Sequence, residues 1–145
     1  MRIDFQYIKD FLDVVLDHDH PDFKINQEGI KPLWDGDDKE RINKFVFHME
    51  ILEDQGLIES STSSPGVGFT RMGDGGFSVS IKPLRLTAQG HQFAVDLAKP
   101  GVFEQLKTSF KDAGPAETVK IVFALGKKAL EKRLDSFWNS QRKST

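Results

Sequence analysis

The chain has 145 residues, 12 phenylalanines and no cysteine, which suits one domain or one domain with a helical addition. Without cysteine it has no disulfide framework, no thiolate metal site and no cysteine nucleophile. The formal net charge is −2, no apolar stretch is long enough to span a membrane, and the N-terminus has no signal-peptide core, so we expect a cytoplasmic protein with no membrane partner.

A first helix is predicted over residues 4–17, where apolar residues recur at three- and four-residue steps. It ends before Pro21, because the residue that precedes a proline avoids helical backbone angles. Residues 23–25 alternate like a short edge strand. Residues 26–36 contain two glycines and a proline, which favours a loop or a single turn of helix. The buried face of the first helix is expected to comprise Phe5, Ile8, Leu12, Val15 and Leu16.

The strongest local signals lie in residues 37–59. Asp37 or Asp38 can cap a helix, and Glu40 lies where a capping box places a carboxylate. Gly56 suits the left-handed backbone that commonly follows a last helical turn. The apolar face of this helix is expected to comprise Ile42, Phe45, Val46, Met49 and Leu52.

The next part of the chain is predicted to be a hairpin followed by helices. Residues 57–61 form a strand, and residues 60–76 form a mobile loop because they are rich in serine and glycine. Residues 77–84 alternate again and return the chain as a second strand. Three helices follow, of which the first is capped by Thr87 and the last begins at Pro115. They are expected to end at Pro100, at Asp112 and near Trp138, before a frayed end over residues 139–145.

These elements together predict an α+β fold, a winged helix-turn-helix with a small antiparallel wing and additional C-terminal helices. Residues 37–59 would supply the third helix and the first strand of the wing, and residues 26–36 would hold an eroded second helix. We expect a winged-helix domain over residues 1–98. Residues 99–145 would form a helical extension that packs on this domain or is used for oligomerisation.

Three segments support this interpretation by resemblance. They are MRIDFQYIKDFL at residues 1–12, FHMEILEDQGLIE at residues 47–59 and RLTAQGHQFAVDL at residues 85–97. Together they resemble a bacterial and prophage family, domain of unknown function 2513, and the RLTxxGHxF pattern from Arg85 to Phe93 is the most specific part. The resemblance implies a winged-helix fold in a phage or mobile-element setting, and it implies no catalytic residues.

A winged helix suggests binding to double-stranded DNA, in which the third helix enters the major groove and the wing reaches neighbouring phosphates. The alternative is a solvated helix face of mixed charge. The candidate DNA-binding residues are Lys39, Arg41, Asn43, Lys44 and His48 on the helix, with Arg71 and Lys82 in the wing.

The distribution of charge counts against this interpretation. Residues 1–98 hold 10 Lys and Arg against 17 Asp and Glu, a net charge of −7, whereas residues 99–145 hold 10 against 5, a net charge of +5. Neutralisation of phosphates supplies most of the affinity for nucleic acid. The expected function is DNA binding in a regulatory role. The alternative is a non-catalytic protein-interaction or inhibitor module that keeps the fold without binding DNA.

The last helix is a candidate partner surface, because it is strongly amphipathic and basic. A homodimer or another protein would bind through Leu130, Leu134, Phe137 and Trp138. In the alternative interpretation this helix packs on the first helix of its own chain and completes the core.

Histidines and serines give no enzymatic pattern. His18 and His20, close to Asp17, Asp19 and Asp22, have residue types that bind metals but lie at a helix end without fixed geometry, so a solvated turn is the simpler interpretation. His48 and His91 lie near apolar positions, and each is expected to be a packed or partly buried side chain that donates to a backbone carbonyl rather than a catalytic base. We therefore expect neither an enzyme, a metal site nor a cofactor.

Overall fold

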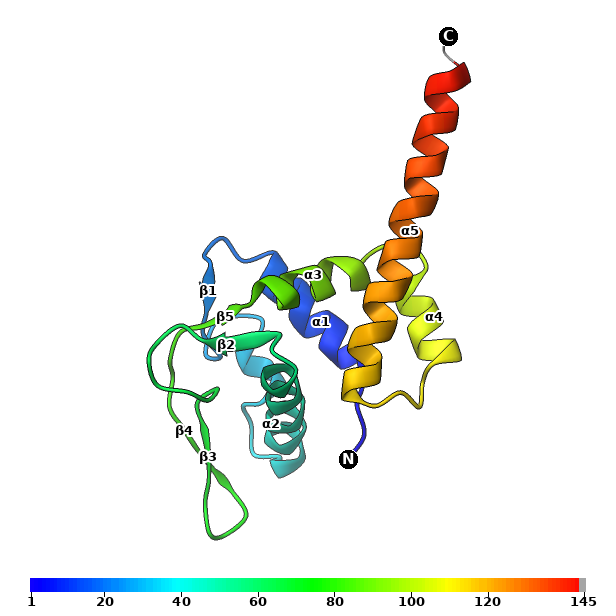
Figure 1. Ribbon diagram of the computed structural model, residues 1–145. Helices are drawn as coiled ribbons and strands as arrows, with labels where there is room; N and C mark the ends of the chain where they lie inside the picture. The colour runs from blue at the N-terminus through cyan, green and yellow to red at the C-terminus, as the bar shows by residue number, and fades with distance from the viewer. Residues whose placement is uncertain (144–145) are drawn as a thin grey trace. The chain divides into compact units, whose positions relative to one another are not determined.

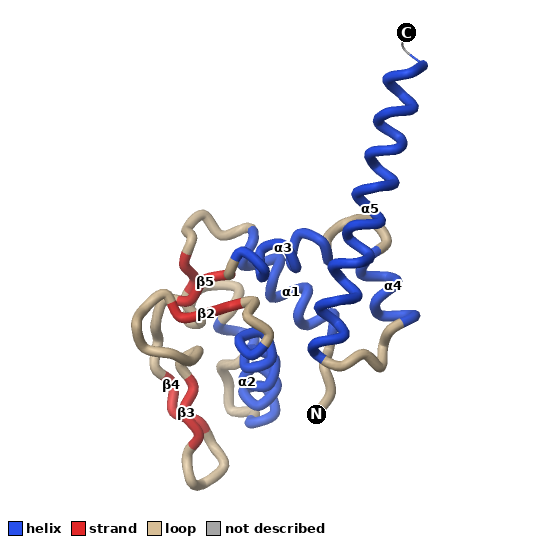
Figure 2. The backbone as a smooth tube through the Cα atoms, in the orientation of Figure 1, coloured by secondary structure: helices blue, strands red, loops and turns tan. Residues whose placement is uncertain are grey.

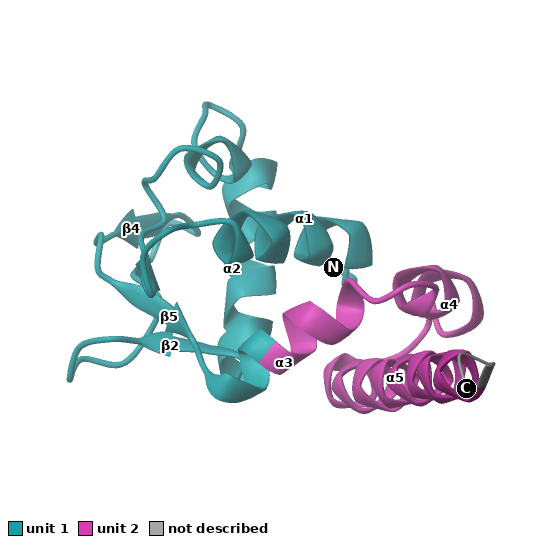
Figure 3. Cartoon of the chain, turned by 90° about the horizontal axis from the view of Figure 1, so that it is seen from above, with its two compact units in different colours: residues 1–91 teal, residues 92–145 magenta. Residues whose placement is uncertain are grey.

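The computed structural model describes residues 1–143, and these form an α+β protein with five α-helices and two small antiparallel sheets (Figures 1 and 2). The chain divides into two compact units, Met1–His91 and Gln92–Thr145 (Figure 3). This division falls inside the helix Ala88–Leu97, and the expected domains, residues 1–98 and 99–145, stay a prediction. The elements are α1 (Phe5–Leu16), β1 (Asp22–Phe23), the 3-10 helix η1 (Lys31–Leu33), α2 (Lys39–Asp54), β2 (Ile58–Ser60), β3 (Phe69–Arg71), β4 (Phe77–Val79), β5 (Leu84–Leu86), α3 (Ala88–Leu97), α4 (Val102–Ser109) and α5 (Pro115–Lys143).

The first two helices both begin at an aspartate cap, of which only the second was predicted from the sequence. The Asp4 carboxylate accepts a hydrogen bond from the backbone N–H of Tyr7 at the start of α1. Asp38, rather than Asp37, caps α2 by accepting from the backbone N–H of Glu40 at 2.9 Å. Each cap pairs one of the backbone donors that a helix leaves free at its N-terminus.

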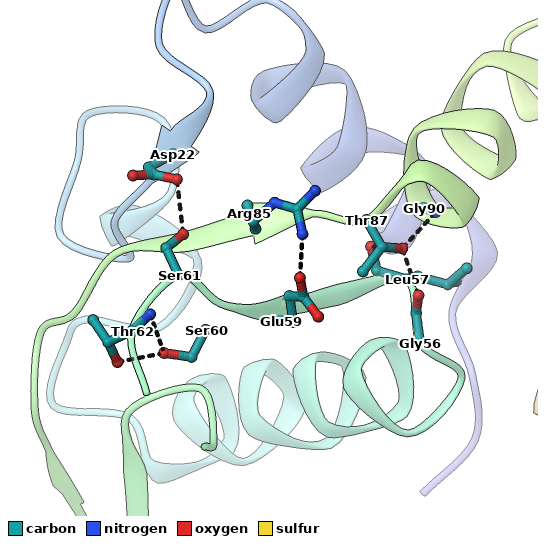
Figure 4. Close-up of polar contacts among 10 residues, drawn as sticks. All are labelled: Asp22, Gly56, Leu57, Glu59, Ser60, Ser61, Thr62, Arg85, Thr87 and Gly90. Carbon is teal, nitrogen blue, oxygen red and sulfur yellow. Dashed lines mark hydrogen bonds and ion pairs between the residues drawn. The ribbon is translucent and has the colours of Figure 1, made fainter. Parts of the chain in front are cut away.

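The larger sheet has the strand order β1-β5-β2, with both pairings antiparallel. The central strand β5 therefore forms hydrogen bonds to both neighbours. Two side-chain contacts support these pairings (Figure 4): Ser61 donates to the Asp22 carboxylate at 2.7 Å, and Arg85 of β5 forms an ion pair with Glu59 of β2. The sheet thus joins a strand that precedes α2 to the two strands of the same sheet that follow it.

The segment between β2 and β5 differs from the prediction. Residues 60–76 are not loop throughout, because β3 lies within them and pairs with β4. Residues 77–84 are not one strand, since β4 and β5 belong to different sheets. The physical reason is aromatic packing that composition conceals: the Phe69 ring contacts the Phe77 ring across the β3-β4 ribbon at 6.4 Å and the Phe45 ring of α2 at 5.7 Å.

The core of the first unit is built around α1 and α2. Phe45 is fully buried, and its ring also lies 6.2 Å from that of Phe11 and 6.4 Å from that of Trp34. Trp34 is held in place by a hydrogen bond from its Nε1 to the Ile25 carbonyl at 2.8 Å. The segment expected to be a loop or a single turn is therefore tied to the core, with η1 as its only helical part among the described residues.

In the second unit, the first half of α5 packs on α3 and α4. Val119 and Val122 are buried, and the Phe123 ring contacts the Phe93 ring at 6.3 Å. The helix continues to Lys143 rather than ending near Trp138, so residues 139–143 are helical. Residues 144 and 145 of the predicted frayed end lie outside the described residues. Within residues 1–143, no helix combines the length and the apolar character needed to cross a membrane.

Candidate nucleic-acid interface

Three of the seven candidate DNA-binding residues lie exposed on the first turns of α2. These are Lys39, Arg41 and Asn43. Lys39 and Asn43 are four residues apart and share one side of the helix. Arg41 lies on another side, where its Nη1 donates to the Asp35 carbonyl at 3.3 Å. The structure therefore places one cation and one amide together and a second cation nearby.

Lys44 of α2 has a side chain that is 41% exposed and is engaged within the chain. Its ammonium group forms an ion pair with the Asp4 carboxylate at 2.8 Å and lies 4.7 Å from the centre of the Tyr7 ring. Tyr7 belongs to α1, so Lys44 points from α2 to α1. Lys44 is therefore paired within the chain, and its role in DNA binding stays a prediction.

His48 is buried, so its predicted place on a DNA-facing surface is wrong. Its Nε2 accepts a hydrogen bond from the backbone N–H of Asp4 at 2.9 Å, so its Nδ1 carries the proton and donates to the Lys44 carbonyl at 2.7 Å. The alternative expectation, a packed histidine that donates to a backbone carbonyl, is confirmed. Burial lowers the pKa of His48 below its ordinary value, which favours this neutral form.

Asp4 joins these contacts into one network between α1 and α2. Burial raises the pKa of Asp4, but the hydrogen bonds from Lys44 and from the backbone N–H of Tyr7 lower it by more, so the pKa lies below its ordinary value. Burial, with a smaller contribution from the Asp4 charge, raises the pKa of Tyr7 to about 12. Sequence reasoning missed this role of Asp4, because forty-four residues separate it from His48.

We expect this network to make stability depend on pH. His48 has a lower pKa in the folded chain than when unfolded, so its neutral form contributes stability that is present above the unfolded value, about 6.5. The contribution is lost as pH falls from there through the folded pKa. Denaturant unfolding between pH 7.5 and 5 should show a decline in the free energy of unfolding, and His48→Gln should flatten it.

His91 is exposed, so the expectation that it is packed or partly buried is wrong. The matched control is therefore His91→Gln, which should leave the decline in place. An equal decline in wild type and in the His48 variant would contradict the assignment. The lowered pKa of Asp4 affects stability in a different pH range. Its contribution to the free energy of unfolding is lost only as pH falls below the unfolded pKa of the carboxyl, about 3.9.

The two wing candidates are both engaged within the chain. Arg71 of β3 donates two hydrogen bonds to the carboxylate of Glu50 of α2, at 2.7 and 2.6 Å. This fork-like pairing is the strongest geometry open to arginine and a carboxylate, and it lowers the pKa of Glu50. Lys82 donates to the carbonyls of Ser64 and Pro65 at 3.2 and 2.7 Å. Both cations thus hold the segment between β2 and β5 in place, and no local sequence signal connects Glu50 to Arg71.

The histidines at the end of α1 are exposed and form the rim of an open hollow of about 570 Å³. The His18 and His20 rings lie 6.5 Å apart, and His20 accepts a hydrogen bond from the backbone N–H of Asp22 at 3.0 Å. Within residues 1–143, no three His, Asp or Glu side chains are arranged to hold a metal ion.

Comparison with known proteins adds no family to this geometry. No family model, curated protein or solved structure matches the chain. The resemblance to domain of unknown function 2513 therefore stays a prediction, as does any role in DNA binding.

The predicted partner residues all lie in the exposed second half of α5. The exposed fractions are 44% for Leu130, 43% for Leu134, 51% for Phe137 and 56% for Trp138. Their side chains do not take part in the core of the second unit. They form an apolar stripe, which we call the α5 stripe and define by these four residues.

Proposed function

We propose that the protein is a non-catalytic DNA-binding protein of the winged-helix type, in which the first turns of α2 meet the duplex. The observation that carries this proposal is the exposure of Lys39, Arg41 and Asn43 on α2. In the sequence, this helix lies between β1 and β2, two strands of the larger sheet. The strand order β1-β5-β2 supports it, because a winged helix places one strand before its recognition helix and a hairpin after it. Similarity of arrangement alone is a weak reason to assign function, so binding must be measured.

The electrostatics imply weak binding by a single copy. Met1–His91 holds 10 Lys and Arg against 16 Asp and Glu, a net charge of −6, which repels the duplex within about 8–10 Å at moderate salt. On α2, Lys39 and Arg41 are exposed, whereas Lys44 forms an ion pair with Asp4. Two phosphate contacts correspond to a slope of about −2 in a plot of log affinity against log salt.

A fluorescence anisotropy titration of a mixed-sequence duplex at several low salt concentrations tests this proposal. Wild type should bind with a slope near −2, and Lys39→Ala with Arg41→Ala should flatten the slope towards zero without changing the helical circular dichroism. Glu50→Gln should do the opposite, because it releases Arg71 and can add about one phosphate contact.

The matched control is Lys31→Ala, which removes one exposed cation outside α2. It should leave the slope unchanged. A slope that depends equally on Lys31 would mean diffuse attraction rather than a helix–groove contact, and a double variant with the wild-type slope would place any binding elsewhere on the chain.

A regulatory role in a prophage or mobile element rests on the family resemblance alone. The second candidate function is a protein-interaction or inhibitor module that keeps the fold without binding DNA. It is favoured by the internal engagement of Lys44, His48, Arg71 and Lys82. The absence of any anisotropy change at low salt and high protein concentration would support this second candidate over the first.

A further inference from the structure

The α5 stripe continues a face of the helix that is already used for packing. Phe123 contacts Phe93 of α3, and Leu130 follows it by seven residues on the same side of α5. α4 also lies beside the first half of α5 (Figure 1). The side of α5 that carries Phe123 therefore runs on to Leu130, with the exposed Lys127 between them.

The spacing along this face is that of a coiled coil. Phe123, Lys127, Leu130, Leu134, Phe137 and Gln141 follow one another at alternating four- and three-residue steps, which is the a/d pattern of a heptad repeat. Leu134 then occupies an a position, and Leu130 and Phe137 occupy d positions. Two of the three a positions, Lys127 and Gln141, are polar, which costs stability.

The charges fit a pair of identical helices once the heptad positions are assigned. Lys128 and Arg142 fall at b and Lys132 falls at f, all on the side away from a partner helix. Their mutual repulsion across a pair is therefore screened by solvent. The cations at these outward positions therefore do not oppose pairing with a second copy, and Lys127 is the cation that meets its own counterpart in the seam.

The flanking positions distinguish the orientation of the pair. Arg133 falls at g and Trp138 falls at e of the next heptad, the two positions that meet between parallel helices. A guanidinium over an indole ring is a favourable contact, and a parallel pair would form it twice. An antiparallel pair joins e to e and g to g, so Trp138 would face Glu131 instead.

We propose that α5 pairs with α5 of a second copy of this chain as a parallel two-stranded coiled coil over residues 127–141. This self-association does not depend on DNA binding. The contact is short, with three apolar layers at Leu130, Leu134 and Phe137, so the dimer dissociates on dilution. Two-helix contacts of this length lie well below the area of a permanent dimer.

The absence of native cysteine makes a single-cysteine test unambiguous. Gln141→Cys places one thiol at an a position, where the two copies of a parallel pair come within disulfide distance. Mild oxidation should convert most of this variant to a covalent dimer at concentrations where wild type is dimeric. The matched control, Asn139→Cys, places the thiol at the outward f position and should give little cross-linked product.

Sedimentation equilibrium measures the association itself. Leu134→Ala with Phe137→Ala should raise the dimer dissociation constant at least tenfold, whereas Lys132→Ala at the outward position should leave it unchanged. Both truncated side chains are about half exposed, so circular dichroism of the variant should match wild type.

Two results would overturn the proposal. One is a wild type that stays monomeric up to millimolar concentration. The other is a dimer in which Gln141→Cys cross-links no better than Asn139→Cys, since that excludes the parallel arrangement. Either result leaves the DNA proposal standing, because anisotropy with a monomer tests it separately.

Discussion

Replacing Phe45 with alanine should lower the free energy of unfolding by about 3–5 kcal/mol, the usual cost of truncating a buried phenylalanine. Phe45 is fully buried, and its ring contacts Phe11 of α1, Trp34 and Phe69 of β3. The truncation therefore leaves a cavity at the point where α1, α2 and the β3-β4 ribbon meet. Chemical denaturation at constant temperature measures the effect.

Phe45→Leu is the matched control, because it keeps most of the volume and should cost less than about 1.5 kcal/mol if the neighbours repack. The comparison separates loss of packing from loss of the aromatic ring. Unfolding of Phe45→Ala at the same denaturant concentration as wild type would remove Phe45 from the core.

Gly90→Ala should destabilise the protein even though alanine is the better helix former. Helix propensity alone predicts a gain of about 1 kcal/mol. However, a Cβ on Gly90 would overlap the carbonyl oxygen of Leu57, which is backbone and cannot turn aside. The same carbonyl accepts the backbone N–H of Thr87 at 3.0 Å, and the Thr87 hydroxyl donates to the Gly56 carbonyl at 2.5 Å and accepts from the backbone N–H of Gly90 at 2.9 Å (Figure 4).

The overlap must displace the start of α3 from the end of α2, so these hydrogen bonds are strained together. We expect a net loss of about 1–3 kcal/mol or more, the range for forced overpacking. Gly73→Ala is the control, because nothing lies within 4 Å of its Cβ position and its effect should stay within about 0.5 kcal/mol. A more stable Gly90→Ala protein would show that propensity outweighs the contact.

The helices could be predicted because their signals are local. Asp4 and Asp38 precede runs of apolar residues at helical spacing, and Gly56 adopts the positive φ, 70°, that its position suggests. β3 could not be predicted in the same way. Its three residues lie among serines and glycines, and Phe69 is fixed by α2 and β4 rather than by its neighbours in sequence.

The candidate interface was predicted less well than the fold, and the reason is also distance in sequence. A helical pattern shows which residues face the core, but it does not show which exposed cation has a carboxylate opposite it. Lys44 has Asp4, and Arg71 has Glu50, 40 and 21 residues away. Gly90 gives a similar case. From the sequence alone it is a poor helix former inside a helix, and the reason for a glycine there, the lack of room for a Cβ beside the Leu57 carbonyl, is seen only in the structure.

The central place of β5 has a consequence for the order in which the chain can fold during synthesis. β1 and β2 pair only with β5 in the larger sheet, through registers such as Asp22 with Arg85 and Ile58 with Leu86. Neither early strand can therefore find its partner until β5 has left the ribosome. Until then, only the packing of α1 with α2 can shield their apolar faces from water. A nascent chain that stalls before Leu84 holds two strands whose backbone hydrogen-bonding groups have no partner strand.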